Sequence, residues 1–342
     1  MMNNHLLPAE WECEGAIMLA WPHADTDWAY MLDEVRLCFS GIVKALAPWT
    51  KVIIVAPDIS EPKKYLEQSG LSNIFYFRCP TNDTWTRDYG PITIDTPEGK
   101  KPVDFGFNGW GLKFAADRDN LVTSRMSKAG LLTVSPENRR NFILEGGGIE
   151  SDGAGMLMTT SACQLSPNRN PTLSEDEIKE YLCSAFGGKK AIMLHHGHLD
   201  GDDTDSHIDT IARFAPNNTI VYTGCDDRND THFSDFDAME QELMAVRNLE
   251  GNPFNLLRLP LPDAIFDENG ERLPATYANF LALPNAVIMP TYSQPRKDDL
   301  ARQILMTVFD VPVITVDCRA LIKQHGSLHC MTMQIPNEIL AI

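Results

Sequence analysis

The chain has 342 residues and a formal net charge of −18, from 47 Asp and Glu against 29 Lys and Arg. This balance excludes the cationic footprint with which proteins bind nucleic acid, so no nucleic-acid partner is expected. An acidic field raises the local concentration of a small cationic ligand, although solubility alone explains the charge equally well. Hydrophobic residues make up 43% and charged residues 22%, as in ordinary globular enzymes.

Short apolar runs alternate with helical patterns from end to end. Length and β-branched content favour strands for the apolar runs. The first helix is marked by its apolar spacing, and the second by a capping box at Ser174 and Glu177 and a stop at Gly187. In chain order we predict strands over 16–20 and 52–55, strands over 142–144 and 156–158, and strands over 191–194, 219–222, 286–289 and 311–316. Predicted helices cover 33–46, 174–186, 236–246 and 298–308.

This alternation indicates an α/β fold. A doubly wound sheet is not favoured, because the glycines at 146–148 lie mid-chain and lack the dinucleotide-binding spacing. Strand–helix units recur often enough to allow a radial architecture. No break in composition marks a boundary, so residues 1–342 are predicted to form a single domain.

The eight cysteines are scattered, with no Cys-x-x-Cys pair. This pattern argues against a zinc ribbon or a dense disulfide framework, and it suits a reducing compartment. Residues 1–5 lack the basic segment of a signal peptide, and no apolar stretch is long enough to span a bilayer. We therefore expect a cytoplasmic protein without membrane contact.

Cys330 is the most informative residue, in the run Gly-Ser-Leu-His-Cys-Met-Thr at 326–332. A thiolate is a strong nucleophile, and it needs a lowered pKa or a nearby base. His325 and His329 are sequence neighbours, and Gly326 suggests a tight turn that exposes the thiol. Taken alone, the residue would more often be a buried free cysteine.

His207 and Asp209 are the candidates for proton transfer and charge binding. On an extended segment their side chains, two positions apart, would point to the same face. That placement suits a general acid/base beside a carboxylate that binds a cation. The alternative is an ordinary surface or capping histidine.

Two further carboxylates lie in turn-like or glycine-rich settings. Asp88 precedes a Gly-Pro pair, and Glu145 follows an apolar strand and precedes three glycines that let a ligand approach the backbone. A turn aspartate and a solvated strand-end glutamate are the alternatives. Each signal alone is weak, but together with Cys330 they suggest nucleophilic chemistry on a cationic carbon.

Metal sites are the rival interpretation. Residues 200–209 are rich in Asp, but an EF-hand needs Gly at its sixth position and Glu at its twelfth, where this chain has Asp205 and Ile211. A zinc site could draw on the histidines at 195, 196, 198 and 207, whose spacing matches no helical zinc motif. A metal-dependent hydrolase is therefore kept as an alternative.

At these residues the chain resembles the agmatine deiminases of the guanidine-modifying, or pentein, superfamily. The resemblance covers nearly the whole chain, and so many motifs in the same order make chance agreement improbable. The matching motifs lie at 8–12, 19–23, 82–91, 105–111, 145–153, 207–214 and 326–330.

The resemblance implies ββαβ-type units around a pseudo-fivefold axis, an α/β-propeller with the active site in its central channel. It implies Cys330 as nucleophile and His207 as general acid/base. Asp88 and Asp209 would hold the guanidinium, and Glu145 would assist. Binding roles are also expected for Trp85, Trp110 and Gly326, and a homodimer is the expected assembly.

Two positions depart from the family pattern. Gly148 stands where many members carry Ser, and residues 333–335 replace a more common Gln-Gln ending. Neither departure removes a catalytic group, and the resemblance defines the outer pocket and the substrate preference less closely than it defines the catalytic groups. The resemblance implies no metal and no cofactor.

The expected substrate is agmatine, in putrescine biosynthesis, and the alternatives are arginine, a peptidyl-arginine, or binding of a guanidine without turnover. An arginine enzyme needs a cationic partner for the substrate carboxylate, and Arg87 and Arg169 are the candidates. Agmatine ends in an ammonium, which acidic and aromatic walls suit.

Overall fold

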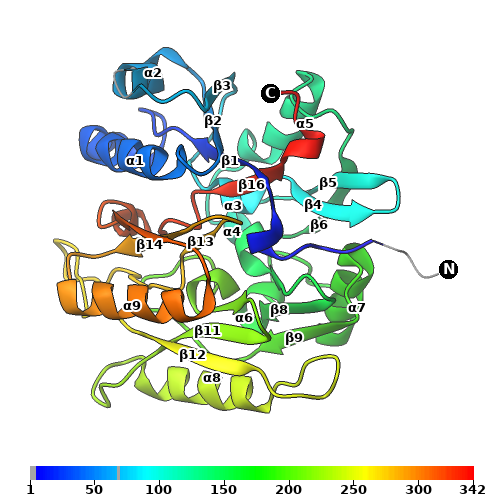
Figure 1. Cartoon of the computed structure of the whole chain (residues 1–342), viewed down its shortest axis with the longest axis vertical. Coiled ribbons are helices and arrows are strands. Elements are labelled where there is room, and N and C mark those ends of the chain that lie inside the picture. Colours follow the sequence, from blue (N-terminus) through cyan, green and yellow to red (C-terminus); the bar gives the residue numbers. More distant parts are fainter. Residues whose placement is uncertain (1–4, 68–69) are drawn as a thin grey trace.

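The structure is a computed structural model that describes residues 5–67 and 70–342. Within these residues, the strands form five small sheets packed around the centre of the molecule (Figure 1). Four sheets have three strands and one has four.

One strand pattern is repeated in every sheet. Two strands pair antiparallel, and the second then pairs parallel with a third strand. Parallel neighbours need a long crossover connection, which here contains a helix. The units are β4 (Ile92–Thr96), β5 (Gly99–Gly106), α5 (Val122–Lys128), β6 (Glu137–Ile143); β7 (Glu150–Ser151), β8 (Met156–Thr160), α7 (Glu175–Phe186), β9 (Lys190–Leu194); β10 (Ala212–Ala215), β11 (Thr219–Gly224), α8 (Phe233–Ala245), β12 (Asn255–Pro260); and β13 (Leu281–Ala282), β14 (Val287–Thr291), α9 (Pro295–Val308), β15 (Val313–Asp317).

The fifth unit joins the two ends of the chain. Strand β16 (Met333–Pro336) pairs antiparallel with β1 (Gly15–Ala20), which pairs parallel with β2 (Lys51–Ala56) across helix α1 (Leu32–Leu46). Strand β3 (Ile74–Arg78) extends this sheet, after helix α2 (Ser60–Leu66). The closing contact requires glycine at position 15, because a Cβ there would lie 2.0 Å from the carbonyl oxygen of Ile335.

The predicted helices and strands are confirmed, with ends that differ by a few residues. Ser174 and Glu177 form the predicted capping box of α7, and Gly187 ends this helix in the left-handed conformation. The predicted strand 142–144 belongs to the longer β6, whose sequence Glu-Asn-Arg-Arg-Asn-Phe-Ile is mostly polar. A mostly polar strand is not predicted from apolar side chains, because it is held in place by backbone hydrogen bonds to its neighbouring strand.

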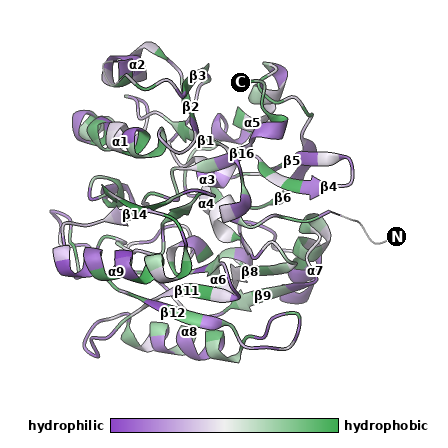
Figure 2. Ribbon diagram, viewed as in Figure 1, coloured by the Kyte–Doolittle hydropathy of each residue, from purple (hydrophilic) through white to green (hydrophobic). Residues whose placement is uncertain are grey.

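The helices bury one face against the sheets. In α1 the buried side chains include Val35, Phe39, Ile42 and Leu46, at helical spacing. Figure 2 shows hydrophobic residues alternating with hydrophilic ones along α1, α8 and α9. Among the described residues, no helix has the length and apolar character needed to cross a bilayer.

Gly41 in the interior of α1 offers a stability test. A Cβ at this position meets no atom within 4 Å, and Gly costs roughly 0.5–1 kcal/mol relative to Ala inside a helix. We expect Gly41→Ala to raise the free energy of unfolding by about this amount in denaturant titration. Gly15→Ala, which places a methyl group against Ile335, should lower it; a stabilised Gly15 variant would contradict the observed chain closure.

Candidate active site

The five residues predicted to carry the chemistry meet at the centre of the molecule. They come from separate units: helix α3 (Thr86–Tyr89), the loop after β6, the segment before β10, and the loop before β16. All five side chains are buried. The residues are Asp88, Glu145, His207, Asp209 and Cys330.

The Cys330 thiol lies between a carboxylate and an amide. Its Sγ is 3.9 Å from Oδ2 of Asp209 and accepts a hydrogen bond from Nδ2 of Asn279 at 3.2 Å. The Asn279 Oδ1 accepts the backbone N–H of His329 at 2.8 Å and of Cys330 at 3.3 Å. One amide therefore holds the loop and donates to the sulfur.

The thiol is not exposed by a turn, contrary to the sequence expectation. Cys330 is 6% exposed, and its pKa is raised well above the usual value by burial and by the charges of Asp209 and Asp88. Neither neighbouring histidine serves it as a base, since His329 bonds Asp209 and His325 bonds the carbonyl of Gly201. The Cys330 thiol is therefore protonated at rest.

This state predicts the labelling behaviour of the free protein. We expect iodoacetamide to modify Cys330 slowly at neutral pH and about tenfold faster per pH unit in the alkaline range, because the thiolate is the reactive form. Mass spectrometry of the Cys330 peptide would measure the rate against a free thiol in the same tube. Rapid labelling that is independent of pH below 7 would show a thiolate and contradict the raised pKa.

His207 is buried between two carboxylates. Its Nδ1 lies 3.6 Å from Oδ1 of Asp88, and its Nε2 lies 4.0 Å from Oε2 of Glu145. Burial favours the neutral ring, but Asp88, with Cys163 and Glu145, outweighs it and raises the pKa of His207 well above 6.5. The imidazolium is the resting form, ready to donate a proton.

The predicted extended segment at 206–209 is wrong. His207 caps a short 3-10 helix, Ile208–Thr210, whose turn is closed by the N–H of Thr210 bonding the carbonyl of His207. The tight turn, rather than the alternation of a strand, directs His207 and Asp209 to the same site.

Asp88 is held by a backbone and an indole donor. The N–H of Gly147 donates to Oδ1 at 3.0 Å, and Nε1 of Trp110 donates to Oδ2 at 2.9 Å. Burial raises the pKa of Asp88 to about 6, and His207 opposes the shift. A Cβ at Gly147 would lie 2.6 Å from Nδ1 of His207, so glycine is needed for this close approach.

Trp110 is aimed at Asp88 by a strained turn. Residues Gly109–Leu112 all have positive φ, between 55° and 79°. Left-handed backbone costs of order 1–3 kcal/mol for a residue other than glycine, and two of these four residues are glycines. Strain of this kind at a ligand pocket is an observation that points to a function.

Asp209 keeps one oxygen free. Oδ2 is 2.7 Å from Nδ1 of His329, whereas the buried Oδ1 has no hydrogen-bond partner among the described residues. Burial disfavours ionisation, but the hydrogen bond and charge of His329, with His207 and Arg213, lower the pKa of Asp209. An ionised carboxylate with a vacant acceptor suits an N–H donor from a ligand.

Glu145 is fully buried and paired with Arg169. Nε of Arg169 donates to both carboxylate oxygens, at 3.0 and 2.9 Å, and Nη1 contacts Oδ2 of Asp205 at 2.6 Å. Arg87, the other candidate cation, contacts Glu10 at 3.3 Å and is also buried. Both arginines are therefore committed to the protein.

A pocket opens above Cys330. Three aromatic side chains line it, and a Cβ at Gly326 would lie 2.3 Å from the Trp85 ring, so glycine lets the indole reach the wall. Apart from the Cys330 thiol, the ionisable side chains of its wall belong to four Asp residues and His325. The lining residues are Asp27, Asp83, Trp85, Asp88, Trp110, Phe114, Asp203, Thr204, Gln324, His325, Gly326 and Cys330.

Residues 6–336 match the family described as Porphyromonas-type peptidyl-arginine deiminase. The chain belongs to this family. It is thereby placed among the hydrolases that act on C–N bonds of amidines, and the predicted resemblance to agmatine deiminases is confirmed.

Relatives and solved structures agree over nearly the full length. The chain is 31% identical to a Marinomonas sp. (strain MWYL1) protein provisionally named an agmatine deiminase, covering 98% of this chain and 96% of the relative. The substrate-bound agmatine deiminase of C. jejuni has 36% identity and a TM-score of 0.91, with 98% and 97% covered. A protein of Porphyromonas gingivalis provisionally named an arginine deiminase has 46% identity and a TM-score of 0.93, with 98% and 100% covered. The pentein α/β fold is confirmed by these structures.

The acidic run of this deiminase-family chain does not converge on one point. Asp205 bonds Arg169, Asp202 accepts from Thr204 and Ser206, and Asp209 faces Cys330. The histidines at 195, 196 and 198 are exposed, whereas His207 is buried. Among the described residues, neither metal site considered from the sequence is assembled by the fold.

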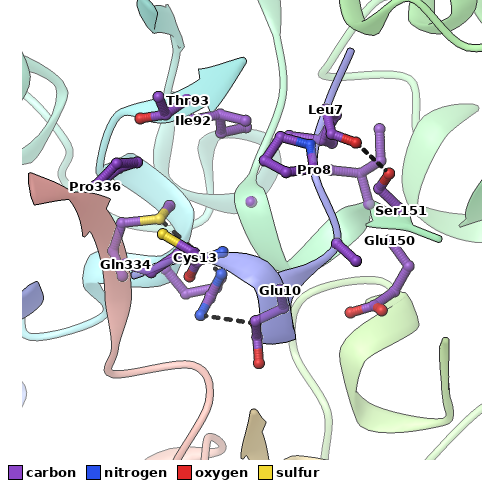
Figure 3. A pocket seen from close by; sticks show the side chains of 15 residues that line it. Leu7, Pro8, Glu10, Cys13, Ile92, Thr93, Glu150, Ser151, Gln334 and Pro336 are labelled. Carbon is purple, nitrogen blue, oxygen red and sulfur yellow. Dashed lines mark hydrogen bonds and ion pairs between the residues drawn. The ribbon is translucent and has the colours of Figure 1, made fainter. Parts of the chain in front are cut away.

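A second cavity of the deiminase is lined by residues that include Glu10, Arg87 and Glu150 (Figure 3). Glu10 from its wall pairs with Arg87 and Arg213 and contacts His329, which in turn bonds Asp209. Burial opposes ionisation of Glu10, but His329, Arg213 and Arg87 lower its pKa strongly. This buried ion-pair network fixes the orientation of His329 and hence of Asp209.

Sequence reasoning missed three of the deiminase's positioning groups. Asn279 lies in no short motif, and Arg169 and His329 were given other roles. The residues that these three groups contact are distant in the sequence. Their positioning roles could be predicted only by knowing which loops meet in the fold.

Proposed function

We propose that the protein is an agmatine deiminase that hydrolyses agmatine to N-carbamoylputrescine and ammonia, in cytoplasmic putrescine synthesis. The observation that carries the proposal is the wall of the pocket over Cys330, which is acidic and aromatic and has no Lys or Arg in the part of the chain that the structure describes. The two arginines considered for a substrate carboxylate are buried in ion pairs. A terminal ammonium fits this wall, whereas a carboxylate would be repelled.

The guanidinium would bind between Asp88 and Asp209. Oδ1 of Asp209 is a buried acceptor without a partner among the described residues, and Asp88 lines the pocket together with Cys330. Two carboxylates can bind the N–H edges of a guanidinium and hold its carbon over the sulfur of Cys330. The cation also favours loss of the thiol proton, because it offsets the negative charge that raises the thiol pKa.

The chemistry would proceed through a covalent intermediate. The Cys330 thiol first loses its proton to solvent. The thiolate then attacks the guanidinium carbon and forms a neutral tetrahedral adduct. The His207 imidazolium donates its proton to a leaving nitrogen, the C–N bond breaks, and ammonia departs from a cationic amidino-thioether. The now neutral His207 takes a proton from water, which attacks the same carbon. Collapse of that adduct breaks the C–S bond and releases the ureido product and the thiol.

Other residues would assist without reacting. Glu145 supports the positive charge on His207 from 4.0 Å. Trp85 and Trp110 would enclose the aliphatic chain of the substrate, and Gly326 leaves room for Trp85. General acid/base assistance is worth roughly 10²–10⁴-fold. Cys330 and His207 supply the nucleophile and the proton transfers of this mechanism, and Asp88 and Asp209 supply the binding of the guanidinium.

The test is ammonia release from agmatine, free arginine and a peptidyl-arginine in parallel. We expect turnover of agmatine only. Peptidyl-arginine is the second candidate, because the matching family carries that name; its turnover in place of agmatine would refute the proposal.

Asp203→Asn tests the acidic wall. Burial raises the pKa of Asp203 to about 6, so the side chain is mostly ionised at pH 8. Loss of its charge should raise KM for agmatine about fivefold, with little change in kcat, because a partly exposed ion pair contributes up to about 1 kcal/mol. Asp299→Asn, which removes an exposed charge on α9, is the matched control. An unchanged KM for Asp203→Asn would remove this residue from ammonium recognition.

A further inference from the structure

Cys163 is a buried thiol that the proposed chemistry does not use. It lies on the short helix α6 (Ser161–Gln164), directly after β8, and is fully buried. Its Sγ, one nitrogen of His207 and one oxygen of Glu145 all lie within 4.8 Å of one another. Within the described ranges, these residues form a group of potential metal ligands.

The thiol reaches this place because position 148 is glycine. A Cβ at Gly148 would lie 3.3 Å from Sγ of Cys163, 3.3 Å from Nε2 of Gln164 and 3.8 Å from Cδ2 of His207. A methyl group there would be tight against the Cys163 thiol and the Gln164 amide and in ordinary contact with the imidazole. Glycine at this position therefore leaves the thiol and the imidazole close together.

Two polar atoms in this region lack protein partners. Nε2 of His207, which is 1% exposed, and Oε1 of the buried Gln164 have no hydrogen-bond partner among residues 5–67 and 70–342. A buried polar group without a partner costs roughly 1–3 kcal/mol. Once Nε2 of His207 gives up its proton, an imidazole nitrogen, a thiol and a carboxylate lie side by side, which is the donor set of a zinc site.

The local charges balance a divalent cation. The Arg169 guanidinium bonds Glu145, but it also contacts Asp205 at 2.6 Å, which offsets its charge. A Cys163 thiolate and the Glu145 carboxylate would then neutralise the two charges of the ion. Zn²⁺ ligands at 2.0–2.3 Å lie about 3.3–3.8 Å apart in a tetrahedron, so the side chains need to close by about 1 Å.

We propose that Glu145, Cys163 and His207 form an inhibitory site for a thiophilic divalent cation such as Zn²⁺. Binding follows from the donor set alone; its inhibitory effect rests on the proposed function. An imidazole whose Nε2 is ligated cannot become imidazolium, so His207 could not protonate the leaving nitrogen. The cation has no part in the catalytic chemistry and blocks its proton donor.

Binding is tested first without activity. In a Cys330→Ala background, which removes the other active-site thiol, titration with Cd²⁺ should produce the ultraviolet thiolate-to-metal charge-transfer band. Adding Cys163→Ser should abolish the part of the charge-transfer band that comes from this site. Adding Cys183→Ser, which changes a half-buried thiol on α7, should leave that part of the band unchanged. Thermal melting would show that each variant is folded.

Adding His207→Gln to the Cys330→Ala protein keeps the test decisive if Cys163→Ser does not fold. This variant should weaken Cd²⁺ binding by roughly tenfold or more, as loss of a ligand requires. A charge-transfer band of equal size and affinity with and without Cys163 or His207 would overturn the site.

Inhibition is tested in the protein with Cys330 present. Zn²⁺ should inhibit ammonia release from agmatine, and a chelator should restore it. With each protein's rate expressed as a fraction of its rate without Zn²⁺, Cys163→Ser should raise the Zn²⁺ concentration that gives half inhibition roughly tenfold. Equal inhibition of both proteins would refute the inhibitory role. If agmatine is not turned over while Cd²⁺ binding still depends on Cys163, the proposed function fails and the metal site stands.

Discussion

Replacing Cys330 by Ala is expected to lower agmatine turnover by about 10⁴-fold or more, since no other thiol can attack the bound guanidinium carbon. Cys163, the thiol grouped with His207 and Glu145, does not line the pocket over Cys330. The readout is ammonia release together with intact-protein mass spectrometry after acid quenching. The parent protein should accumulate a mass increase equal to the amidino group with its aminobutyl chain, and the variant should not.

Cys183→Ala is the matched control, because it removes a half-buried thiol from α7, outside the pocket. It should keep both activity and the adduct. Turnover that survives Cys330→Ala would remove the residue as nucleophile and return attention to a metal-dependent hydrolase. An adduct on a different cysteine would have the same consequence for the assignment.

Asp209→Asn is expected to cause the second large loss. The substitution removes the ionised carboxylate whose free Oδ1 faces the site and turns one acceptor into an amide donor. A guanidinium that loses a buried charged partner should lose roughly 10³-fold in kcat/KM, which corresponds to about 4 kcal/mol at 1.36 kcal/mol per factor of ten. Steady-state kinetics with agmatine would measure the effect.

The matched control is Asp263→Asn, which removes the same charge from an exposed ion pair with Lys297. It should change kcat/KM by less than about twofold, which separates local binding from the field of the whole acidic protein. Melting temperatures would show whether the Asp209→Asn protein is intact, because His329 loses its anionic partner. A folded Asp209→Asn protein with unchanged kcat/KM would exclude this carboxylate from guanidinium binding.

The sequence was sufficient to select the candidate site residues, because each lies in a short contiguous motif. Asp88, Glu145, His207, Asp209 and Cys330 were all predicted, and the fold brings them together. The regular helices were equally accessible, since burial of one face leaves a periodic pattern within a few turns.

The partners of these residues were not predictable in the same way. Asn279 meets Cys330 across 51 positions and Arg169 meets Glu145 across 24, so neither pairing is visible in local spacing. The mostly polar β6 was missed in large part, because its strand state depends on pairing with β5. The extended geometry assumed for residues 206–209 was wrong, because the backbone forms a tight 3-10 turn there.

By itself, the sequence determined the alternation of elements, the acidic character and the set of groups able to react, because all of these are local or compositional. Only the tertiary structure decided the ionisation of those groups. Burial raises the pKa of the Cys330 thiol, Asp88 with its neighbours raises that of His207, and the ion-pair network lowers that of Asp209. These shifts arise from exclusion of water and from charges brought close by distant segments, quantities that exist only once the chain is folded.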